Sequence, residues 1–529
     1  MKHLAGCSVL ILGLGASGLA MARWCRRQGA RVQVWDSREQ APMREALEQE
    51  AGSSSFFSGP LDPAVLLDVH LVLKSPGLSP LDPQVAPLLQ AAQADRVPVA
   101  AELALFARAL ADLQADRGYA PQVLAITGTN GKTTATQLTG LLLQRSGRRV
   151  AVAGNIGPTL LDTLSQALDA AEQDRDVLLP EVWVLELSSF QLDGVEGFEP
   201  TAAAVLNITQ DHLDWHGDMA HYVQAKSRVF GPSPRIQEDA SVALSSTIMV
   251  INRSDERVAA LEPAPIAVKG TRGRAAKPLV RRTLRFGLDA PSCPGDFGLV
   301  VERGMAWLVR AHPQDEEEGR SACAADEELH LQRLMPADAL RIRGRHNAAN
   351  ALAALALATA IGCPLGVMLH GLREYTGELH RMSFVLRAAD IDVYDDSKGT
   401  NVGATVAAVQ GLGQDIEPAR LVLLLGGDGK GQDFSPLRGP LARHVRAVAL
   451  YGRDAPAIAD ALTGLDLPIQ RHTNLVAASA WAFEQAHRGD SVLLSPACAS
   501  LDQFRDYKHR AGVFVGQAQA WAQAMGAVA

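Results

Sequence analysis

The chain has 529 residues, of which 47% are hydrophobic and 20% charged, so it is expected to be globular, with about two to four domains, and not disordered. A net charge of -8 argues against broad nucleic-acid binding. The six cysteines are scattered without paired spacing, which favours a reducing compartment and no zinc site.

The first predicted unit is a strand, turn, helix and second strand over residues 7–37, CSVLILGLGASGLAMARWCRRQGARVQVWDS. Its turn carries Gly13, Gly15 and Gly18 in G-x-G-x-x-G spacing, and Asp36 follows the last glycine by 18 residues. Such glycines let backbone N–H groups approach a diphosphate at a helix N-terminus. The unit predicts a Rossmann-like domain, with the same βαβ fold lacking a ligand as the alternative. Because the apolar run ends in this turn, no signal peptide is predicted and a cytoplasmic protein is expected.

A second unit begins near residue 120 with a predicted strand, APQVLAITG, followed by the loop GTNGKTT and an amphipathic helix. The loop resembles G-x-x-x-x-G-K-[ST], but Ile126 replaces the first glycine. Backbone N–H groups from Gly128 to Lys132 are expected to wrap phosphates, with Lys132 supplying charge and Thr133 a magnesium ligand. Thr134 adds a hydroxyl. A glycine turn with a solvent-exposed lysine is the alternative.

Two more strands are predicted in this unit, in EVWVLELSSFQL and PTAAAVLNIT. Glu186 lies in the first of them, and because a carboxylate is rarely buried without a partner, it is a candidate magnesium ligand or a member of a structural ion pair. After the second strand, His212 is expected at the strand end, where open α/β sheets bind ligands. His216 is expected at the surface. Apolar strands separated by helices predict a parallel sheet covered on both faces.

The pattern is lost between about 232 and 345, where a basic run (269–282) and an acidic run (315–328) are expected to be solvated loops rather than an anion or nucleic-acid site. The uncharged stretch 351–372 is broken by Gly362-Cys363-Pro364, so a buried helix and a second short helix are expected instead of a membrane span.

A third α/β unit is predicted from about residue 380. Its segments YDDSKGTN and LLLGGDGKGQDF each follow an apolar strand and offer an acid and a lysine, Asp396 with Lys398 and Asp428 with Lys430. HRMSF adds Arg381. Basic residues on two different units suit an anionic reaction centre enclosed between domains.

Seven segments occur in the order found in Mur ligases: AITGTNGKTT, LELSSFQL, NITQDHLD, GRHNAANALAALALA, DSKGTN, GGDGKGQDFSPL and LLSPACASLDQFRDYKHR. The chain therefore resembles that family, in particular its D-glutamate-adding branch, and the short phosphate loop is the form that the family uses. The resemblance implies a three-domain α/β fold. A Rossmann-like domain (1–102) would bind the UDP-substrate, a central P-loop domain (103–378) would bind ATP and carry charged insertions near 235–285 and 310–330, and a C-terminal Rossmann-like domain (379–529) would bind the amino acid.

The resemblance also implies site residues. Those implied for the UDP-substrate are Ala16, Ser17, Asp36, Ser37, Ser75, Asn155 and Ser188. Those implied for ATP are Gly128, Thr129, Asn130, Gly131, Lys132, Thr133, Thr134, Asn347, Asn350, Arg381 and Asp396. Thr133 and Glu186 would hold one Mg²⁺, and His212 with Lys226, carbamylated by CO₂, would hold a second. Those implied for D-glutamate are Lys398, Thr400, Lys430, Ser500, Leu501 and Tyr507, and Lys132, His212, Lys226 and Lys398 would be the catalytic residues.

The implied reaction joins D-glutamate to UDP-N-acetylmuramoyl-L-alanine, with ATP converted to ADP and phosphate, in peptidoglycan precursor synthesis. A cytoplasmic monomer is expected, without nucleic-acid or membrane partners. Three alternatives remain: another Mur ligase or a folylpolyglutamate-synthetase-like ligase, an NAD-dependent dehydrogenase suggested by the first glycine turn alone, and a regulatory P-loop module without ligase activity.

Overall fold

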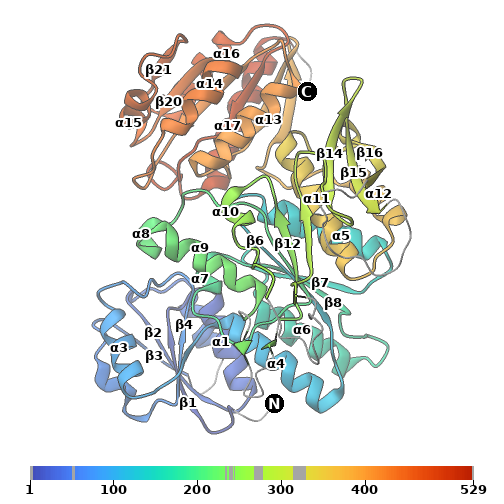
Figure 1. Ribbon diagram of the computed structural model, residues 1–529. Helices are drawn as coiled ribbons and strands as arrows, with labels where there is room; N and C mark the ends of the chain where they lie inside the picture. The colour runs from blue at the N-terminus through green and yellow to red at the C-terminus, as the bar shows by residue number, and fades with distance from the viewer. Residues whose placement is uncertain are drawn as a thin grey trace.

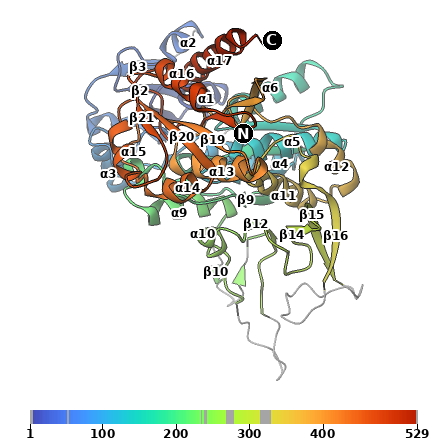
Figure 2. The same cartoon turned by 90° about the horizontal axis from the view of Figure 1, so that it is seen from above.

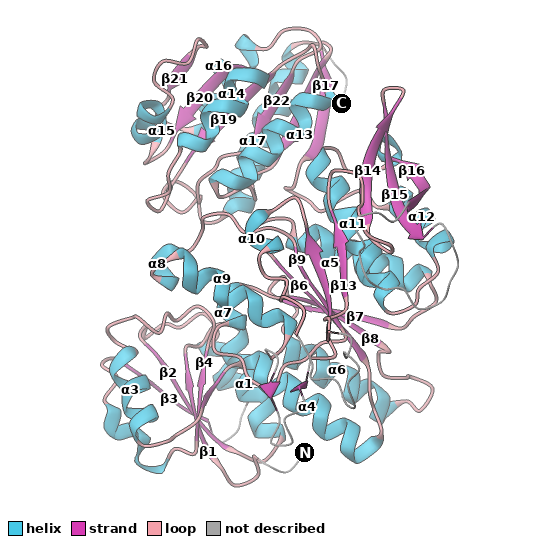
Figure 3. Cartoon of the chain, viewed as in Figure 1, coloured by secondary structure: helices cyan, strands magenta, loops and turns pink. Residues whose placement is uncertain are grey.

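A computed structural model describes residues 4–50, 54–232, 245–266, 278–313 and 329–526, together with the backbone of 235–236 and 242–243. Three α/β units follow one another along the chain and are visible as separate sheets in Figure 1 and Figure 3. Most of the basic run and all of the acidic run lie outside the described residues, so the expectation of solvated loops there remains a prediction.

The N-terminal unit is a five-stranded parallel sheet in the order β3-β2-β1-β4-β5. The glycine turn joins its central strand to the first helix, as the sequence predicts. The elements are β1 (Ser8–Leu12), α1 (Ala16–Arg27), β2 (Arg31–Asp36), α2 (Arg44–Gln49), β3 (Ser54–Ser58), β4 (Leu71–Lys74), α3 (Ala86–Ala94) and β5 (Val99–Ala100).

The central unit is a nine-stranded sheet in the order β16-β15-β14-β13-β12-β9-β6-β8-β7, parallel except at the β14–β15–β16 end. Its first elements are α4 (Glu102–Arg117), β6 (Gln122–Thr127), α5 (Lys132–Arg145), β7 (Val150–Gly154), α6 (Leu160–Gln173), β8 (Val182–Glu186), α7 (Ser189–Leu192), β9 (Ala202–Val205), α8 (Leu213–His216) and α9 (Met219–Ser227). The sheet continues through β12 (Ile248–Asn252), α10 (Glu256–Ala259), β13 (Thr283–Phe286), β14 (Phe297–Glu302), β15 (Met305–Pro313), β16 (Leu329–Pro336), α11 (Arg345–Ala360) and α12 (Leu365–Glu374). A short hairpin pairs β10 (Arg235–Ile236) with β11 (Val242–Ala243).

In the region from 232 to 345, the structure differs from the predicted insertion near 235–285. Strands β12 and β13 lie inside the central sheet and pair in parallel with each other, so the segment 235–285 is not an insertion throughout. The pattern was missed because these strands are short and are separated by charged residues. Helices α11 and α12 form as expected on either side of Gly362-Cys363-Pro364, and no helix in the described ranges is long and apolar enough to cross a bilayer. Cys293 is disulfide-bonded, which the scattered cysteines did not predict.

The C-terminal unit is a six-stranded sheet in the order β17-β18-β22-β19-β20-β21, with only β17 antiparallel. Its elements are β17 (Ser383–Ala388), β18 (Ile391–Asp395), α13 (Val402–Asp415), β19 (Leu421–Gly426), α14 (Arg438–His444), β20 (Val445–Tyr451), α15 (Ala455–Ala461), β21 (Ile469–Arg471), α16 (Leu475–Gln485), β22 (Ser491–Leu494) and α17 (Tyr507–Ala524).

A hydrophobic core joins the first two units, whereas the third unit has cores of its own. One core runs without a break from the N-terminal sheet through α1, α4 and α6 into the central sheet. The C-terminal sheet has two cores, one on each face, and neither includes residues of the other units. Seen from above, the C-terminal unit overlies only part of the central one, and β12, β14, β15 and β16 project beyond it (Figure 2). The first two units therefore pack as one apolar body, and the polar contacts described below join the third unit to it.

Candidate active site

The phosphate loop connects β6 to α5 at the carboxyl edge of the central sheet. Gly128 and Gly131 have φ values of +156° and +81°, and a Cβ on Gly131 would lie 2.4 Å from the Oδ1 atom of Asn350. Both positions therefore require glycine. The ammonium of Lys132 folds back over the loop and donates to the carbonyls of Gly128 (2.9 Å) and Thr129 (2.8 Å).

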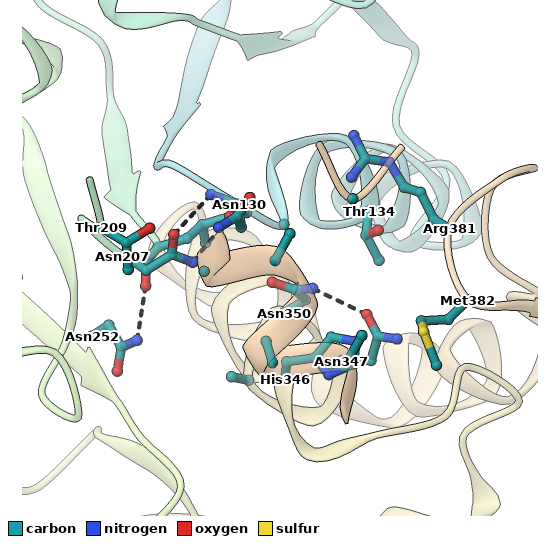
Figure 4. Close-up of a pocket in the computed structure, with 18 of the residues that line it drawn as sticks. Asn130, Thr134, Asn207, Thr209, Asn252, His346, Asn347, Asn350, Arg381 and Met382 are labelled. Atoms are coloured by element: carbon teal, nitrogen blue, oxygen red, sulfur yellow. Dashed lines mark hydrogen bonds between the residues drawn. The ribbon is translucent and has the colours of Figure 1, made fainter. Parts of the chain in front are cut away.

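Side chains from the segment after β9 hold this loop in place. Asn207 accepts from the backbone N–H of Asn130 (2.8 Å) and donates to its carbonyl (3.0 Å). The Thr129 hydroxyl donates to the carbonyl of Thr209 (3.1 Å) and lies 3.0 Å from the hydroxyl of Tyr222. Figure 4 shows Asn207 and Asn130 joined in this way. The loop is thus fixed by hydrogen bonds that leave its remaining N–H groups available to phosphate oxygens.

Glu186 ends β8 beside the loop and is 1% exposed. Its Oε1 atom accepts from the side-chain amide of Asn155 (2.8 Å), whereas Oε2 is buried and accepts no hydrogen bond from the residues that the structure describes. A carboxylate oxygen of this kind is a ligand that Mg²⁺ prefers, and the hydroxyl of Thr133 is the second candidate ligand. That hydroxyl accepts from Arg381 of the C-terminal unit (2.7 Å). Among the residues that the structure describes, no cluster of three or more His, Cys, Asp or Glu side chains forms a metal site by itself.

Lys226 and His212 lie on the other side of the loop. Lys226 is 1% exposed and donates to the carbonyl of Gly128 (2.8 Å), so Lys132 and Lys226 share one acceptor. Burial lowers the pKa of Lys226 well below its ordinary value, and the charge of Lys132 lowers it further. Burial also lowers the pKa of His212 and of Lys132. Burial in this site therefore disfavours the charged forms of these three side chains.

His212 does not end a strand, because β9 stops at Val205. It precedes α8 with φ +55°, and its Nε2 atom lies 3.6 Å from Asp211 Oδ2. His216 was expected at the surface, and this expectation is wrong. It is 6% exposed, its Nε2 atom lies 2.9 Å from the Ser189 hydroxyl, and burial lowers its pKa to about 4.

The C-terminal unit closes the site from above. The Asp396 carboxyl is buried and accepts from Ser495 (2.7 Å), and burial raises its pKa to about 7. Burial, with Arg381 as a further cause, lowers the pKa of Lys398 to about 8, and its ammonium lies 5.4 Å from the ring centre of Tyr507. Two amides, Asn130 and Asn401, exchange hydrogen bonds across the units at 3.0 and 3.2 Å.

These elements enclose a cavity of about 310 Å³ between the central and C-terminal units. This is within the range of small-molecule sites. Its lining includes seven of the residues predicted for ATP: Asn130, Gly131, Thr134, Asn347, Asn350, Arg381 and Asp396. Asn350 donates to Asn347 (3.1 Å), and both come from the first two turns of α11 (Figure 4).

The residues predicted for the UDP-substrate divide between two places. Ala16 and Ser17 begin α1, Ser37 is exposed, and the Ser75 hydroxyl donates to the carbonyl of Gly13 (2.8 Å). Asp36 is 3% exposed, accepts from the N–H of Leu14 (2.8 Å) and pairs with Arg38. Asn155 and Ser188 lie in the central unit instead, where Asn155 holds Glu186 and Ser188 caps α7.

The residues predicted for D-glutamate come from three loops of the C-terminal unit. Asp428 and Ala499 exchange backbone hydrogen bonds (2.9 and 2.8 Å), which brings the loop of Lys430 beside that of Ser500. Ser500 is buried, Thr400 is half-buried, Tyr507 begins α17, and Lys430 is exposed. Leu501 is 70% exposed, so only its backbone is suited to a ligand contact.

Comparison with known sequences agrees with this geometry. Residues 7–100 match the Mur ligase MurD-like N-terminal domain, 126–285 the Mur ligase middle domain and 380–498 the Mur ligase glutamate ligase domain. The chain belongs to the Mur ligase family. It is 55% identical over 529 residues to the UDP-N-acetylmuramoylalanine--D-glutamate ligase of Albidiferax ferrireducens, covering 100% of this chain and 99% of that one. A Burkholderia pseudomallei protein of the same name is 53% identical over 516 residues, covering 96% and 95%.

Solved structures show the same fold for this Mur ligase. The UDP-N-acetylmuramate-alanine ligase MurC of Thermotoga maritima superimposes with a TM-score of 0.54 at 19% identity, over 97% of this chain and 99% of that chain. MurF of Acinetobacter baumannii gives 0.53 at 16% identity, over 98% and 92%. At these identities the comparison establishes the three-domain fold alone.

Several residues of the site in this Mur ligase were not predicted. Asn207 and Asn401 fix the phosphate loop, and His346, Phe286 and Asn252 line the cavity. Asn207 and Asn401 lie inside the segments NITQDHLD and DSKGTN, so the segments carried a signal, but nothing in the local pattern shows which amide reaches across to Asn130.

Proposed function

We propose that this protein is an ATP-dependent ligase that adds D-glutamate to UDP-N-acetylmuramoyl-L-alanine and releases ADP and phosphate. The observation that carries the proposal is the cavity between two units, with the phosphate loop on one wall and Arg381 and Asp396 on the other. Full-length identity of 55% to a protein named for this reaction supports the same substrates.

For ATP, the loop from Gly128 to Thr134 would hold the phosphates. Asn347 and Asn350 would contact the nucleotide, and Arg381 and Asp396 would reach its phosphates and ribose from the C-terminal domain. The fixed loop and the bond from Arg381 to Thr133 support these roles, because positioning and charge supply most of the catalysis in phosphoryl transfer.

Two Mg²⁺ ions would bind beside the loop, one at Thr133 and Glu186 and the other at His212 and Lys226. The unpartnered Oε2 atom of Glu186 fits a cation. When bound, the ions would neutralise charge that develops on the phosphate oxygens. Lys226 would act as a carbamate formed with CO₂. Its low pKa supports this because only the neutral amine reacts with CO₂.

The chemistry has two steps. The terminal carboxylate of UDP-N-acetylmuramoyl-L-alanine attacks the γ-phosphorus of ATP, ADP leaves, and an acyl phosphate forms. The neutral amine of D-glutamate then attacks the acyl carbon, and the tetrahedral intermediate loses phosphate and a proton to give the amide. Both steps gather negative charge, which Lys132 and Lys398 are placed to stabilise.

The substrates would bind on opposite sides of this centre. The UDP part would contact Ala16, Ser17, Asp36, Ser37 and Ser75, and the muramoyl part Asn155 and Ser188. D-Glutamate would bind between Lys398, Thr400, Lys430, Ser500 and the backbone near Leu501 and Tyr507. We place the domain boundaries at 102/103 and 378/379, and we propose a cytoplasmic monomer without nucleic-acid or membrane partners.

One assay tests the proposal: phosphate release from ATP in the presence of UDP-N-acetylmuramoyl-L-alanine, across D-glutamate, L-glutamate, D-alanine, L-alanine and meso-diaminopimelate. Among these five amino acids, only D-glutamate is expected to support turnover. Equal turnover with L-alanine or meso-diaminopimelate would assign a different Mur ligase activity. Phosphate release without amide product would favour a regulatory ATPase.

A further inference from the structure

The short helix α8 rests on the N-terminal domain through Trp215. The hydroxyl of Ser79 donates to the carbonyl of Trp215 (2.9 Å), and the ammonium of Lys74 lies 5.0 Å from the centre of the Trp215 ring. Both side chains are nearly enclosed, at 9% exposure for Lys74 and 7% for Trp215. In Figure 1, α8 lies above the N-terminal sheet, at the side facing the C-terminal domain. This is a cation–π contact between two domains, and it is shielded from water.

Lys74 has few other partners. It donates to the carbonyl of Leu78 (2.8 Å), and in the described part of the chain it forms no ion pair. Burial lowers its pKa to about 8, with Asp193 opposing the shift. An ammonium in such surroundings gains more from an aromatic face than it would in water, because the face does not compete with solvent. The Trp215 ring is therefore a main partner of this buried charge.

From Trp215, ring contacts lead directly to His212. The Phe190 ring lies 4.8 Å from that of Trp215 and 4.7 Å from that of His212, centre to centre. The ring of His216 lies 4.5 Å from that of Trp215 and 5.3 Å from that of Tyr222. Because close-packed interiors transmit strain, we expect a displacement of Trp215 to shift His212 as well.

On the other side, Lys74 is the last residue of β4 and is followed by Ser75. The Ser75 hydroxyl donates to the carbonyl of Gly13, and a Cβ on Gly18 would lie 2.0 Å from that same carbonyl oxygen. The end of β4 thus packs against the glycine turn that we propose holds the UDP part of the substrate. Lys74 therefore connects this proposed UDP-binding site to α8.

We propose that Lys74 is a positioning residue. Its contact with Trp215 fixes the loop bearing His212 relative to the proposed UDP-binding site. Its catalytic consequence rests on the proposed function; its structural consequence does not. Arginine can replace lysine over an aromatic face, whereas methionine keeps the length and apolar stem but removes the charge.

The experiment compares Lys74→Met, Lys74→Arg, Trp215→Leu and the Lys74→Met/Trp215→Leu double variant with wild type. Arg44→Met is the matched control, because the Arg44 guanidinium lies over the Phe56 ring (4.9 Å) within the N-terminal domain and away from α8. The first readout is hydrogen exchange of the backbone amides of residues 213–217, and the second is kcat and KM for each substrate.

We expect faster exchange at 213–217 in Lys74→Met and near-wild-type exchange in Lys74→Arg and Arg44→Met. We also expect kcat/KM for the UDP-substrate to fall about tenfold in Lys74→Met, mainly through KM, with the KM for D-glutamate unchanged. The kcat/KM of the double variant should be no lower than that of Trp215→Leu, because both substitutions remove the same contact between Lys74 and Trp215.

Unchanged exchange in Lys74→Met would overturn the proposal whatever the activity. Additive kinetic losses in the double variant, or failure of arginine to restore the rate, would also overturn it, because either would show that Lys74 acts apart from Trp215. A wild-type protein that does not ligate would overturn the proposed function, and the exchange measurement would still decide the role of Lys74.

Discussion

Replacing Asn155 with alanine tests whether Glu186 is held as a buried anion that lacks a second partner. The side-chain amide of Asn155 donates a hydrogen bond to Glu186 Oε1, at 2.8 Å, and within the described ranges no donor reaches Oε2. A hydrogen bond to a charged group contributes about 1.5–3 kcal/mol, and because Asn155 is exposed although Glu186 is 1% exposed, water can replace part of the lost interaction. We take about 1.5 kcal/mol, the lower end of this range, which corresponds to roughly 3 °C in the unfolding temperature of a unit of this size.

The assay is thermal unfolding of wild type and Asn155→Ala in EDTA, and again with Mg²⁺ and ADP. The gap between the two proteins should narrow in the second condition, because a divalent cation gives the carboxylate another partner. Asn474→Ala is the control: Asn474 caps α16 by accepting from the N–H of Ala477 (2.9 Å), so its loss costs about 1 kcal/mol without any dependence on magnesium. If Asn155→Ala unfolds together with wild type in EDTA, Glu186 does not depend on this hydrogen bond and the reasoning fails.

Four further predictions follow from the site. Lys132→Ala should reduce ligation by about 10²-fold or more while circular dichroism stays native, and near-normal turnover would remove the phosphate loop from the mechanism. Lys226→Ala should be inactive and partly rescued by small carboxylates; an unmodified ammonium in a crystal loaded with metal and substrate would contradict the carbamate. Ser500→Ala combined with Lys430→Ala should raise the KM for D-glutamate before that for ATP, because the donors to its carboxylates are lost, and a selective rise in the ATP KM would argue against this pocket. Burial raises the pKa of Glu102 from 4.5 to about 7, so the folded state binds a proton that the unfolded state releases, and stability is lost as pH rises between these values. Glu102→Gln should therefore unfold at a higher temperature than wild type at about pH 8 but not at about pH 5, and equal differences at both pH values would refute the assignment.

The parts of the site that the sequence predicted are those set by local spacing. The strand, glycine loop and helix around Lys132 are contiguous in the sequence. Glu186 can be recognised as unusual because it is a carboxylate within an otherwise apolar strand. The three domains could be predicted in the same way, from alternating strands and helices and from motifs that occur in a fixed order.

The parts that were missed depend on contacts between distant segments. Asn401 meets Asn130 across 271 residues, and the burial of His216 depends on Ser189 and on neighbouring rings. Strands β12 and β13 are core strands only because β9 and β14 are there to pair with them. A local pattern contains no information about such partners, and a histidine among polar residues reads as exposed.

The carbonyl of Gly128 gives the phosphate loop a built-in stand-in for its ligand. It accepts from both Lys132 and Lys226, so one backbone oxygen holds these two side chains beside the loop. A nucleotide that enters the loop must compete with this oxygen for Lys132, which lowers the net affinity of the nucleotide. Because Lys132 is already ordered beside the loop, little conformational entropy is lost when ATP binds. The enzyme thus has a lower affinity for ATP but a phosphate loop that is preorganised for the reaction.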